Sequence, residues 1–228
     1  MFNSVFCRRA PGISHLLFAD DTLLFFKAEE CDVGTIQDIK TILRVEEDGF
    51  EAKYLGLPTP EGRMNKGKFQ SLQEKLSKRV LQWGENSLSQ GGKEVMIKAV
   101  AQAIPTYVMG VFKLPAGIFG GGLNRGRGRL IWVAWDVMLR PKNMGGLGFK
   151  DMQTFNQALL SRQVWRLIDK PDSLCARVLK AKYYPNGSLV DTVFTGNASS
   201  SWQAIEFGHD LVKNGIIWRI GNGEDVRV

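Results

Sequence analysis

Two adjacent carboxylates, Asp20 and Asp21, lie between two apolar runs in the stretch HLLFADDTLL. Neighbouring carboxylates repel each other, so such a pair is favoured where a cation neutralises both. Mg²⁺ takes oxygen ligands of this kind, and two Mg²⁺ ions about 3.5–4 Å apart can activate an attacking hydroxyl and stabilise a leaving pyrophosphate. An Asp-Asp pair is more often a surface turn than a metal site, but its apolar flanks favour the metal site.

The element that would position this pair is a hairpin. Residues 14–26 are expected to form a strand, a tight turn and a second strand, with Ala-Asp-Asp-Thr at the tip. The nearly continuous apolar runs are typical of strands that are covered on both faces. A hairpin of two strands is marginal without neighbouring strands, so residues 1–60 are the part that we expect to pack least well.

Length and composition limit the kinds of protein that this chain can be. Its 228 residues, 44% of them hydrophobic, suffice to bury a core. No stretch approaches the roughly 18 apolar residues of a membrane span, and the N-terminus lacks the order of a signal peptide. We therefore expect an intracellular protein, nuclear or cytoplasmic, that is not secreted and has no membrane partner.

The cysteines and histidines do not indicate a disulfide framework or a structural zinc site. The three cysteines are scattered without C-x-x-C spacing, and neither histidine has an evident partner for acid–base chemistry. We interpret all five as ordinary structural residues: Cys7, Cys31, Cys175, His15 and His209.

Positive charge is concentrated in the middle of a chain whose net charge is +7. Residues 62–140 hold 13 Lys or Arg and four Asp or Glu. Such a region is a candidate surface for a polyanion, because cations that face phosphates gain from counterion release. The alternative is a solvated helix face, and charge alone does not separate the two. The basic residues that we expect to bind are Lys66, Lys68, Lys75, Lys78, Arg79, Lys93, Lys98, Arg125, Arg127 and Arg129.

Apolar spacing predicts a helix at residues 68–83 whose apolar stripe packs into the core. Its cations Lys75, Lys78 and Arg79 would lie largely on the rest of the helix surface, where they stay available for binding. The same reasoning predicts four further helices, at residues 32–45, 92–104, 152–168 and 199–213.

Residues 117–129, with the sequence GIFGGGLNRGRGR, contain too much Gly and Arg to form a packed element. The segment is either a flexible linker or an Arg-Gly segment that binds nucleic acid. Near the C-terminus, residues 216–228 predict a hairpin with its turn at Asn222-Gly223.

Several blocks of the sequence, in this order, resemble one family. FADDTLLF resembles the Phe/Tyr-x-Asp-Asp hairpin of reverse-transcriptase palms, and KYLGLPTPEGR resembles the Tyr-Leu-Gly segment that follows it in LINE-type, non-LTR retrotransposon polymerases. Three later blocks are similar to the thumb and post-thumb region of the plant members of that family: LSQGGKEVMIKAVAQAIPTYVMGVFKLP, WVAWDVMLRPKNMGGLGFKDMQTFNQALLSRQVWRLI and WRIGNGEDVRV. The resemblance runs from about residue 13 over most of the chain.

The resemblance implies RNA-templated DNA synthesis with Mg²⁺ as the cofactor. By position, Asp20 would be a metal-binding catalytic carboxylate and Asp21 its partner. Tyr54, Leu55 and Gly56 would lie near the end of the primer. The basic helices would hold RNA or DNA, in the family an RNA–DNA hybrid, by its backbone.

Departures from the family lead us to expect that catalysis is lost. The fingers and an earlier palm strand, which supplies another metal-binding aspartate, should precede residue 13, where only twelve residues stand. The connecting segment expected after Val45 is too short, and residues 117–129 replace an aromatic-rich stretch. We also expect no zinc-binding region or RNase H domain downstream. The chain would then be a truncated, catalytically inactive remnant.

The expected fold class is α+β and mostly helical, with a partial reverse-transcriptase palm hairpin followed by thumb-like and C-terminal helices. We expect four regions along the chain. These are a palm remnant at residues 1–60, a basic thumb-like helical region at 61–116, a Gly/Arg linker at 117–129 and a helical post-thumb region at 130–228 that ends in a truncated hairpin.

Three functions remain open at this point. An active polymerase would add nucleotides with Mg²⁺, and the missing carboxylate argues against it. A non-catalytic binder would contact the nucleic-acid backbone with little base specificity, because no base-reading module is recognisable. A remnant that is reused for protein interaction, or that has no selected function, would show neither property.

Overall fold

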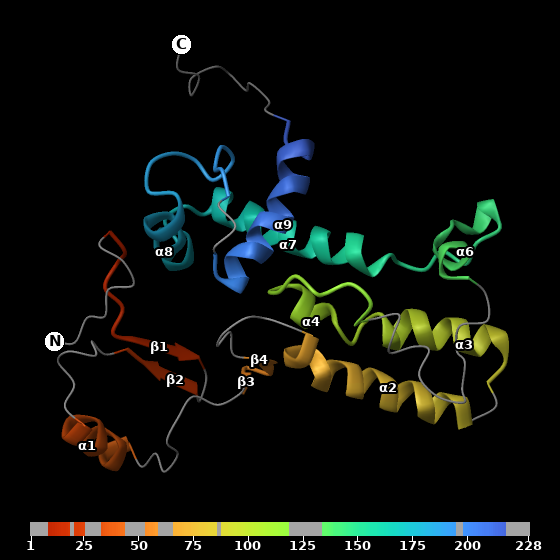
Figure 1. Cartoon of the computed structure of the whole chain (residues 1–228), viewed down its shortest axis with the longest axis horizontal. Coiled ribbons are helices and arrows are strands. Elements are labelled where there is room, and N and C mark those ends of the chain that lie inside the picture. Colours follow the sequence, from red (N-terminus) through yellow and green to blue (C-terminus); the bar gives the residue numbers. More distant parts are fainter. Residues whose placement is uncertain are drawn as a thin grey trace. The chain divides into compact units, whose positions relative to one another are not determined.

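The computed structural model describes eight stretches of the chain: residues 9–18, 21–25, 33–43, 53–58, 66–85, 88–118, 134–194 and 198–217. Within these stretches the fold is mostly helical, with eight α-helices and two short antiparallel hairpins (Figure 1). No larger sheet occurs among the described residues. The expectation of a mostly helical chain is confirmed at this level.

The chain divides into two compact units, with boundaries after Ala52, after Val193 and inside the long helix α7 (Met152–Asp169). The first unit contains Met1–Ala52 and Arg166–Val193, and the second contains Lys53–Trp165 and Phe194–Val228. The division into four regions at residues 60, 116 and 129 stays a prediction.

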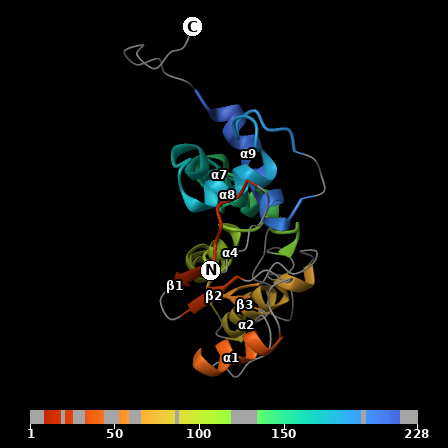
Figure 2. The same cartoon turned by 90° about the vertical axis from the view of Figure 1, so that its left-hand side faces the viewer.

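The first unit contains the hairpin that was expected at residues 14–26. Strand β1 (His15–Phe18) pairs antiparallel with β2 (Asp21–Leu24) (Figure 2). In the register of this pair, Phe18 lies opposite Asp21. The N–H of Phe25 donates to the carbonyl of Ser14 at 2.9 Å, which extends the pairing beyond β1. The hairpin is therefore confirmed.

The expectation that the strands are covered on both faces is wrong for β1. All four residues of β1 are exposed, and the exposed fractions of Leu17 and Phe18 are 68% and 61%. The physical reason is that the hairpin stays a two-stranded sheet in the described part of the chain, and no second layer there covers the side chains of β1.

Two helices complete the described part of the first unit. The predicted helix at 32–45 is confirmed as α1 (Val33–Leu43), on which Ile42 is 78% exposed. Helix α8 (Leu174–Tyr183) was not predicted. It has a recognisable start, because the Ser173 hydroxyl accepts from the N–H of Ala176 at 3.3 Å.

The second unit contains most of the helices and a short hairpin. The hairpin pairs β3 (Lys53–Tyr54) with β4 (Leu57–Pro58). The other elements are η1 (Lys66–Phe69), α2 (Gln70–Glu85), α3 (Gln90–Met96), the π-helical turn η2 (Ile97–Ala101), α4 (Thr106–Met109), α6 (Trp135–Leu139), η3 (Lys142–Met144), most of α7, and α9 (Ser200–Gly215).

These elements confirm four helices that the apolar spacing predicts. Helix α2 covers 68–83 together with η1, and α7 and α9 match 152–168 and 199–213 within two residues. The helix expected at 92–104 is α3 followed by η2. The short helices α4 and α6 were not predicted, since four or five residues are too few to show a period.

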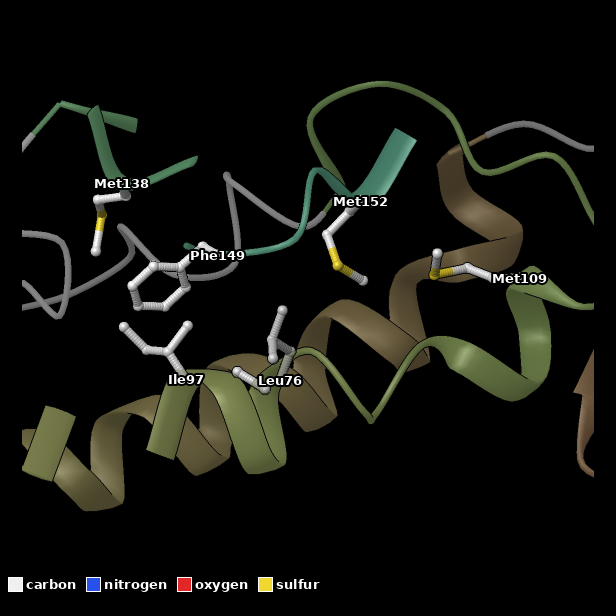
Figure 3. Close-up of a cluster of buried hydrophobic side chains, with 7 residues drawn as sticks. Leu76, Ile97, Met109, Met138, Phe149 and Met152 are labelled. Carbon is white, nitrogen blue, oxygen red and sulfur yellow. The ribbon is translucent and has the colours of Figure 1, made fainter. Parts of the chain in front are cut away.

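The core of the second unit joins these helices. Ile97 of η2 points towards Phe149, and both are buried beside Leu76 of α2 (Figure 3). The same cluster includes Ala101, Met109, Met138 and Met152. A second buried cluster is formed by Phe69, Leu72, Val108, Phe112 and Ile118, with the rings of Phe69 and Phe112 edge to face at 6.3 Å.

Helices α7 and α9 cross at very short range (Figure 1). A Cβ added at Gly208 would lie 2.6 Å from the carbonyl carbon of Leu160, so only glycine permits this approach. The Ser161 hydroxyl donates to the Gly208 carbonyl at 2.9 Å, and the Gln157 amide donates to the Phe207 carbonyl at 3.0 Å. His209, expected to be structural, is buried on α9 with its ring 5.0 Å from that of Phe194.

None of the described helices combines the length and the apolar character that crossing a membrane requires.

Candidate nucleic-acid interface

The exposed cations of α2 form the best-defined basic surface of the second unit. Phe69, Leu72 and Leu76 turn one side of η1 and α2 into the core. Lys75, Lys78 and Arg79 fall outside that stripe and are exposed, as the helical spacing predicts. Among the described residues, no carboxylate lies within ion-pair distance of these three side chains.

The same three cations line one open surface pocket with a volume of about 520 Å³. Gln82 and Ile104 are the other lining residues in the described part of the chain, so the pocket combines positive charge, an amide and an apolar side chain. We refer to Lys75, Lys78, Arg79, Gln82 and Ile104 as the basic pocket. Its charge suits phosphate groups, and its apolar side suits a sugar or a base.

Sequence reasoning missed two of the five residues in the basic pocket. Gln82 was not considered, although it follows Lys75 by seven positions and Arg79 by three, which places it on the same side of a helix. Ile104 comes from another part of the chain, and no local signal indicates that it reaches α2.

The Tyr54–Leu57 segment is a tight turn that accepts a hydrogen bond from a residue of α4. Leu55 and Gly56, between β3 and β4, have φ values of 51° and 75°, the backbone of a two-residue hairpin turn. The hydroxyl of Tyr107 in α4 donates to the Leu55 carbonyl at 3.1 Å. Tyr54 and Gly56, expected near a primer, therefore lie in a turn that is tied to α4.

Lys98, which was also expected to bind nucleic acid, contacts other residues of the protein instead. Its ammonium donates to Glu94 at 2.7 Å and to the carbonyl of Leu147, and it lies 5.1 Å from the centre of the Phe149 ring. The hydrogen bond from Lys98 holds the pKa of Glu94 below its ordinary value of 4.5, and Lys142 acts in the same direction. Lys98 thus joins η2 to residues 147–149.

The six other basic residues that were expected to bind nucleic acid are not among the residues of the basic pocket. Lys66 and Lys68 lie in η1, at the start of α2, and Lys93 is half-buried on α3. Arg125, Arg127 and Arg129 lie outside the described residues, as does most of the 117–129 segment. Its second residue, Ile118, is buried against the core.

The expected metal site lies mostly outside the described residues. Asp20 is not described, and Asp21 is placed as the first residue of β2 without a description of its side chain. The described residues contain no group of three His, Cys, Asp or Glu that could hold a metal ion. Mg²⁺ at Asp20 and Asp21 therefore stays a prediction.

Two curated proteins of Arabidopsis thaliana are similar to this chain. One, "Putative ribonuclease H protein At1g65750", is 32% identical over 186 residues, which cover 75% of this chain and 30% of that protein. The other, "Uncharacterized mitochondrial protein AtMg00310", is 32% identical over 137 residues, which cover 55% of this chain and 89% of that protein. The chain thus spans about 30% of the length of the first relative. No protein-family profile and no solved structure matches it.

Proposed function

Because the chain belongs to the family of the Arabidopsis thaliana mitochondrial protein AtMg00310, we propose that it is a relative of plant retrotransposon reverse transcriptases that binds the backbone of nucleic acids without base specificity. The binding surface in this proposal is the basic pocket. The proposal treats the chain as a binder rather than as a complete polymerase.

Two observations support the relation to retrotransposon polymerases. The blocks FADDTLLF and KYLGLPTPEGR occur in the order of the family's palm, and the first has the hairpin that the palm motif requires. The similarity to a plant protein named as a putative ribonuclease H also supports this relation. An RNA–DNA hybrid is therefore the ligand that we propose first.

The observation that carries the binding proposal is the set of three exposed cations on α2. Exposed lysines and arginines without a carboxylate partner keep their charge available for phosphates. They converge on one pocket instead of being spread around the helix. Contacts of this kind position a nucleic acid and do not read its bases.

One observation favours a second candidate function, the binding of a protein partner. Strand β1 presents Leu17 and Phe18 to solvent, and exposed apolar side chains on a short hairpin are typical of surfaces that a protein covers. Failure of the chain to bind nucleic acid even at low salt would favour this alternative.

The triple variant Lys75→Ala/Lys78→Ala/Arg79→Ala is expected to bind a short RNA–DNA hybrid at least about ten-fold more weakly than the wild type at low salt, because three phosphate contacts are lost. Fluorescence anisotropy with a labelled hybrid measures this. The matched control is Lys170→Ala/Arg177→Ala/Lys180→Ala, which removes three exposed cations of the first unit. Equal losses in both variants would contradict a specific role for the basic pocket.

The same titration tests whether the carboxylate pair binds metal. Mg²⁺ should not strengthen binding by a non-catalytic backbone binder, because as a counterion it competes with the protein for the phosphates. If Mg²⁺ strengthened binding and Asp20→Ala removed that gain, the metal site of the polymerase family would be present, and nucleotide addition would become the activity to measure.

A further inference from the structure

The turn between β3 and β4 carries backbone strain. Among the described residues, Leu55 is the one non-glycine residue with a positive φ, 51°. A left-handed backbone brings Cβ too close to the following carbonyl oxygen, so leucine adopts it at a cost that glycine avoids. Such a conformation persists only where the surroundings impose it, and strained residues concentrate at functional sites.

Tyr107 supplies the group that holds the strained residue. Its hydroxyl donates to the carbonyl oxygen of Leu55 itself, across 52 positions of sequence. The side chain of Tyr107 is 56% exposed, so it is not placed there to fill the core. Leu55 is also exposed, and a Cβ added at Gly56 would meet no atom of the described residues within 4 Å, so these residues leave the tip of the turn open to a ligand.

The turn is connected to the basic pocket through one short segment. Ile104 lines the pocket, and Tyr107 follows it by three residues. The intervening backbone is helical in character, since the N–H of Thr106 donates to Ala103 and that of Met109 donates to Pro105. Residues three apart in such a segment lie on the same side. Ile104, which lines the pocket, and Tyr107, which holds the turn, therefore lie on the same side of the segment 104–107.

We propose that Tyr107 is a positioning residue for nucleic-acid binding: its hydroxyl fixes the left-handed Leu55–Gly56 turn, whose open tip adds a contact that depends on shape to the charge contacts of the basic pocket. The inference rests on the proposed function. It predicts that binding has two separable parts, one set by cations and one set by the geometry of the turn.

Tyr107→Phe keeps the ring and every cation but removes the hydroxyl. It is expected to weaken binding of the RNA–DNA hybrid about five-fold, the effect of one lost hydrogen bond, while the slope of affinity against salt stays that of the wild type. Tyr183→Phe, which removes a tyrosine hydroxyl from α8 of the first unit, is the control and should bind as the wild type does.

A double-mutant cycle separates positioning from direct contact. Glycine adopts the left-handed turn without help, so Tyr107→Phe in a Leu55→Gly background should cost less than about two-fold. A five-fold loss that persists in this background would mean that the hydroxyl contacts the ligand itself, which overturns the positioning role. An unchanged affinity of the single variant Tyr107→Phe would overturn it as well.

The two proposals fail in different ways. If the wild type does not bind the hybrid at low salt, the proposed function fails and the role of Tyr107 falls with it. If the triple variant of the basic pocket loses binding while Tyr107→Phe binds like the wild type, the proposed function stands and only the positioning role fails. Melting temperatures of all variants show whether a loss of binding follows from unfolding.

Discussion

Gly208→Ala is expected to lower the free energy of unfolding by about 2 to 3 kcal/mol, because the new methyl group has no room where α7 and α9 cross. Its Cβ would lie 2.6 Å from the carbonyl carbon of Leu160 and 2.7 Å from the nitrogen of Ser161. Both atoms belong to the backbone of α7, so no rotation of a side chain relieves the clash. Urea denaturation followed by tryptophan fluorescence measures the lost free energy of unfolding. Trp202 is a suitable probe, because it is buried on the same helix as Gly208.

Gly215→Ala is the matched control for this prediction. Gly215 is the last residue of the same helix, and a Cβ there would meet no atom within 4 Å. Alanine is the better helix former, so this variant should be neutral or more stable by up to about 1 kcal/mol. If Gly208→Ala proved as stable as Gly215→Ala, the close crossing of α7 and α9 would be wrong.

Asn156→Leu is expected to destabilise the chain by about 3 kcal/mol or more, because it leaves three backbone groups without a partner. The side-chain amide donates to the carbonyls of Met109 at 2.7 Å and Phe112 at 3.0 Å, and its oxygen accepts from the N–H of Leu114 at 2.9 Å. Asn156 is buried on α7, so water does not replace these bonds. Leucine is also branched at Cγ and is larger, so the change leaves no cavity, and the lost hydrogen bonds are the main cause with crowding added to them.

The control for this variant is Asn214→Leu, at an exposed position of α9. It makes the same chemical change without burying an unsatisfied group and should alter the free energy of unfolding by less than about 0.5 kcal/mol. A small effect at both positions would contradict the role of Asn156 in joining α7 to the segment 109–114. That segment includes the end of α4, so its loss would also disturb Tyr107.

The long helices could be predicted from sequence because their own residues determine them. In α2, the spacing of Phe69, Leu72 and Leu76 indicates both the helix and the side that is buried. The starts of α3 and α9 are fixed locally, because the side chains of Ser89 and Ser199 accept from backbone N–H groups of the first turn. The hairpin β1–β2 was found for the same reason, from two apolar runs around a short turn.

Burial of the hairpin could not be predicted, because it depends on what lies beside it. The apolar runs of β1 fit a strand inside a sheet, yet Leu17 and Phe18 are exposed. The contacts of Lys98 could not be predicted from sequence either. A lysine in a basic region looks like a ligand contact, and only the fold brings Leu147 and Phe149 to it.

The candidate site was predictable only in its charged part. Helical spacing suffices to place Lys75, Lys78 and Arg79 outside the core stripe of α2. The contribution of Ile104 and the hydrogen bond from Tyr107 to Leu55 join segments far apart in sequence, and neither leaves a local signal. The charge of the site can therefore be predicted from the local sequence, whereas its shape depends on the tertiary fold.

The most direct test of the central claim is the salt dependence of binding. The slope of log Kd against log salt concentration, measured from about 50 to about 200 mM with a short RNA–DNA hybrid, counts the phosphate contacts. The account predicts that the Lys75→Ala/Lys78→Ala/Arg79→Ala variant has a slope shallower than that of the wild type by about two to three units. Equal slopes for the two proteins, or wild-type binding that does not respond to salt, would contradict backbone binding at the basic pocket.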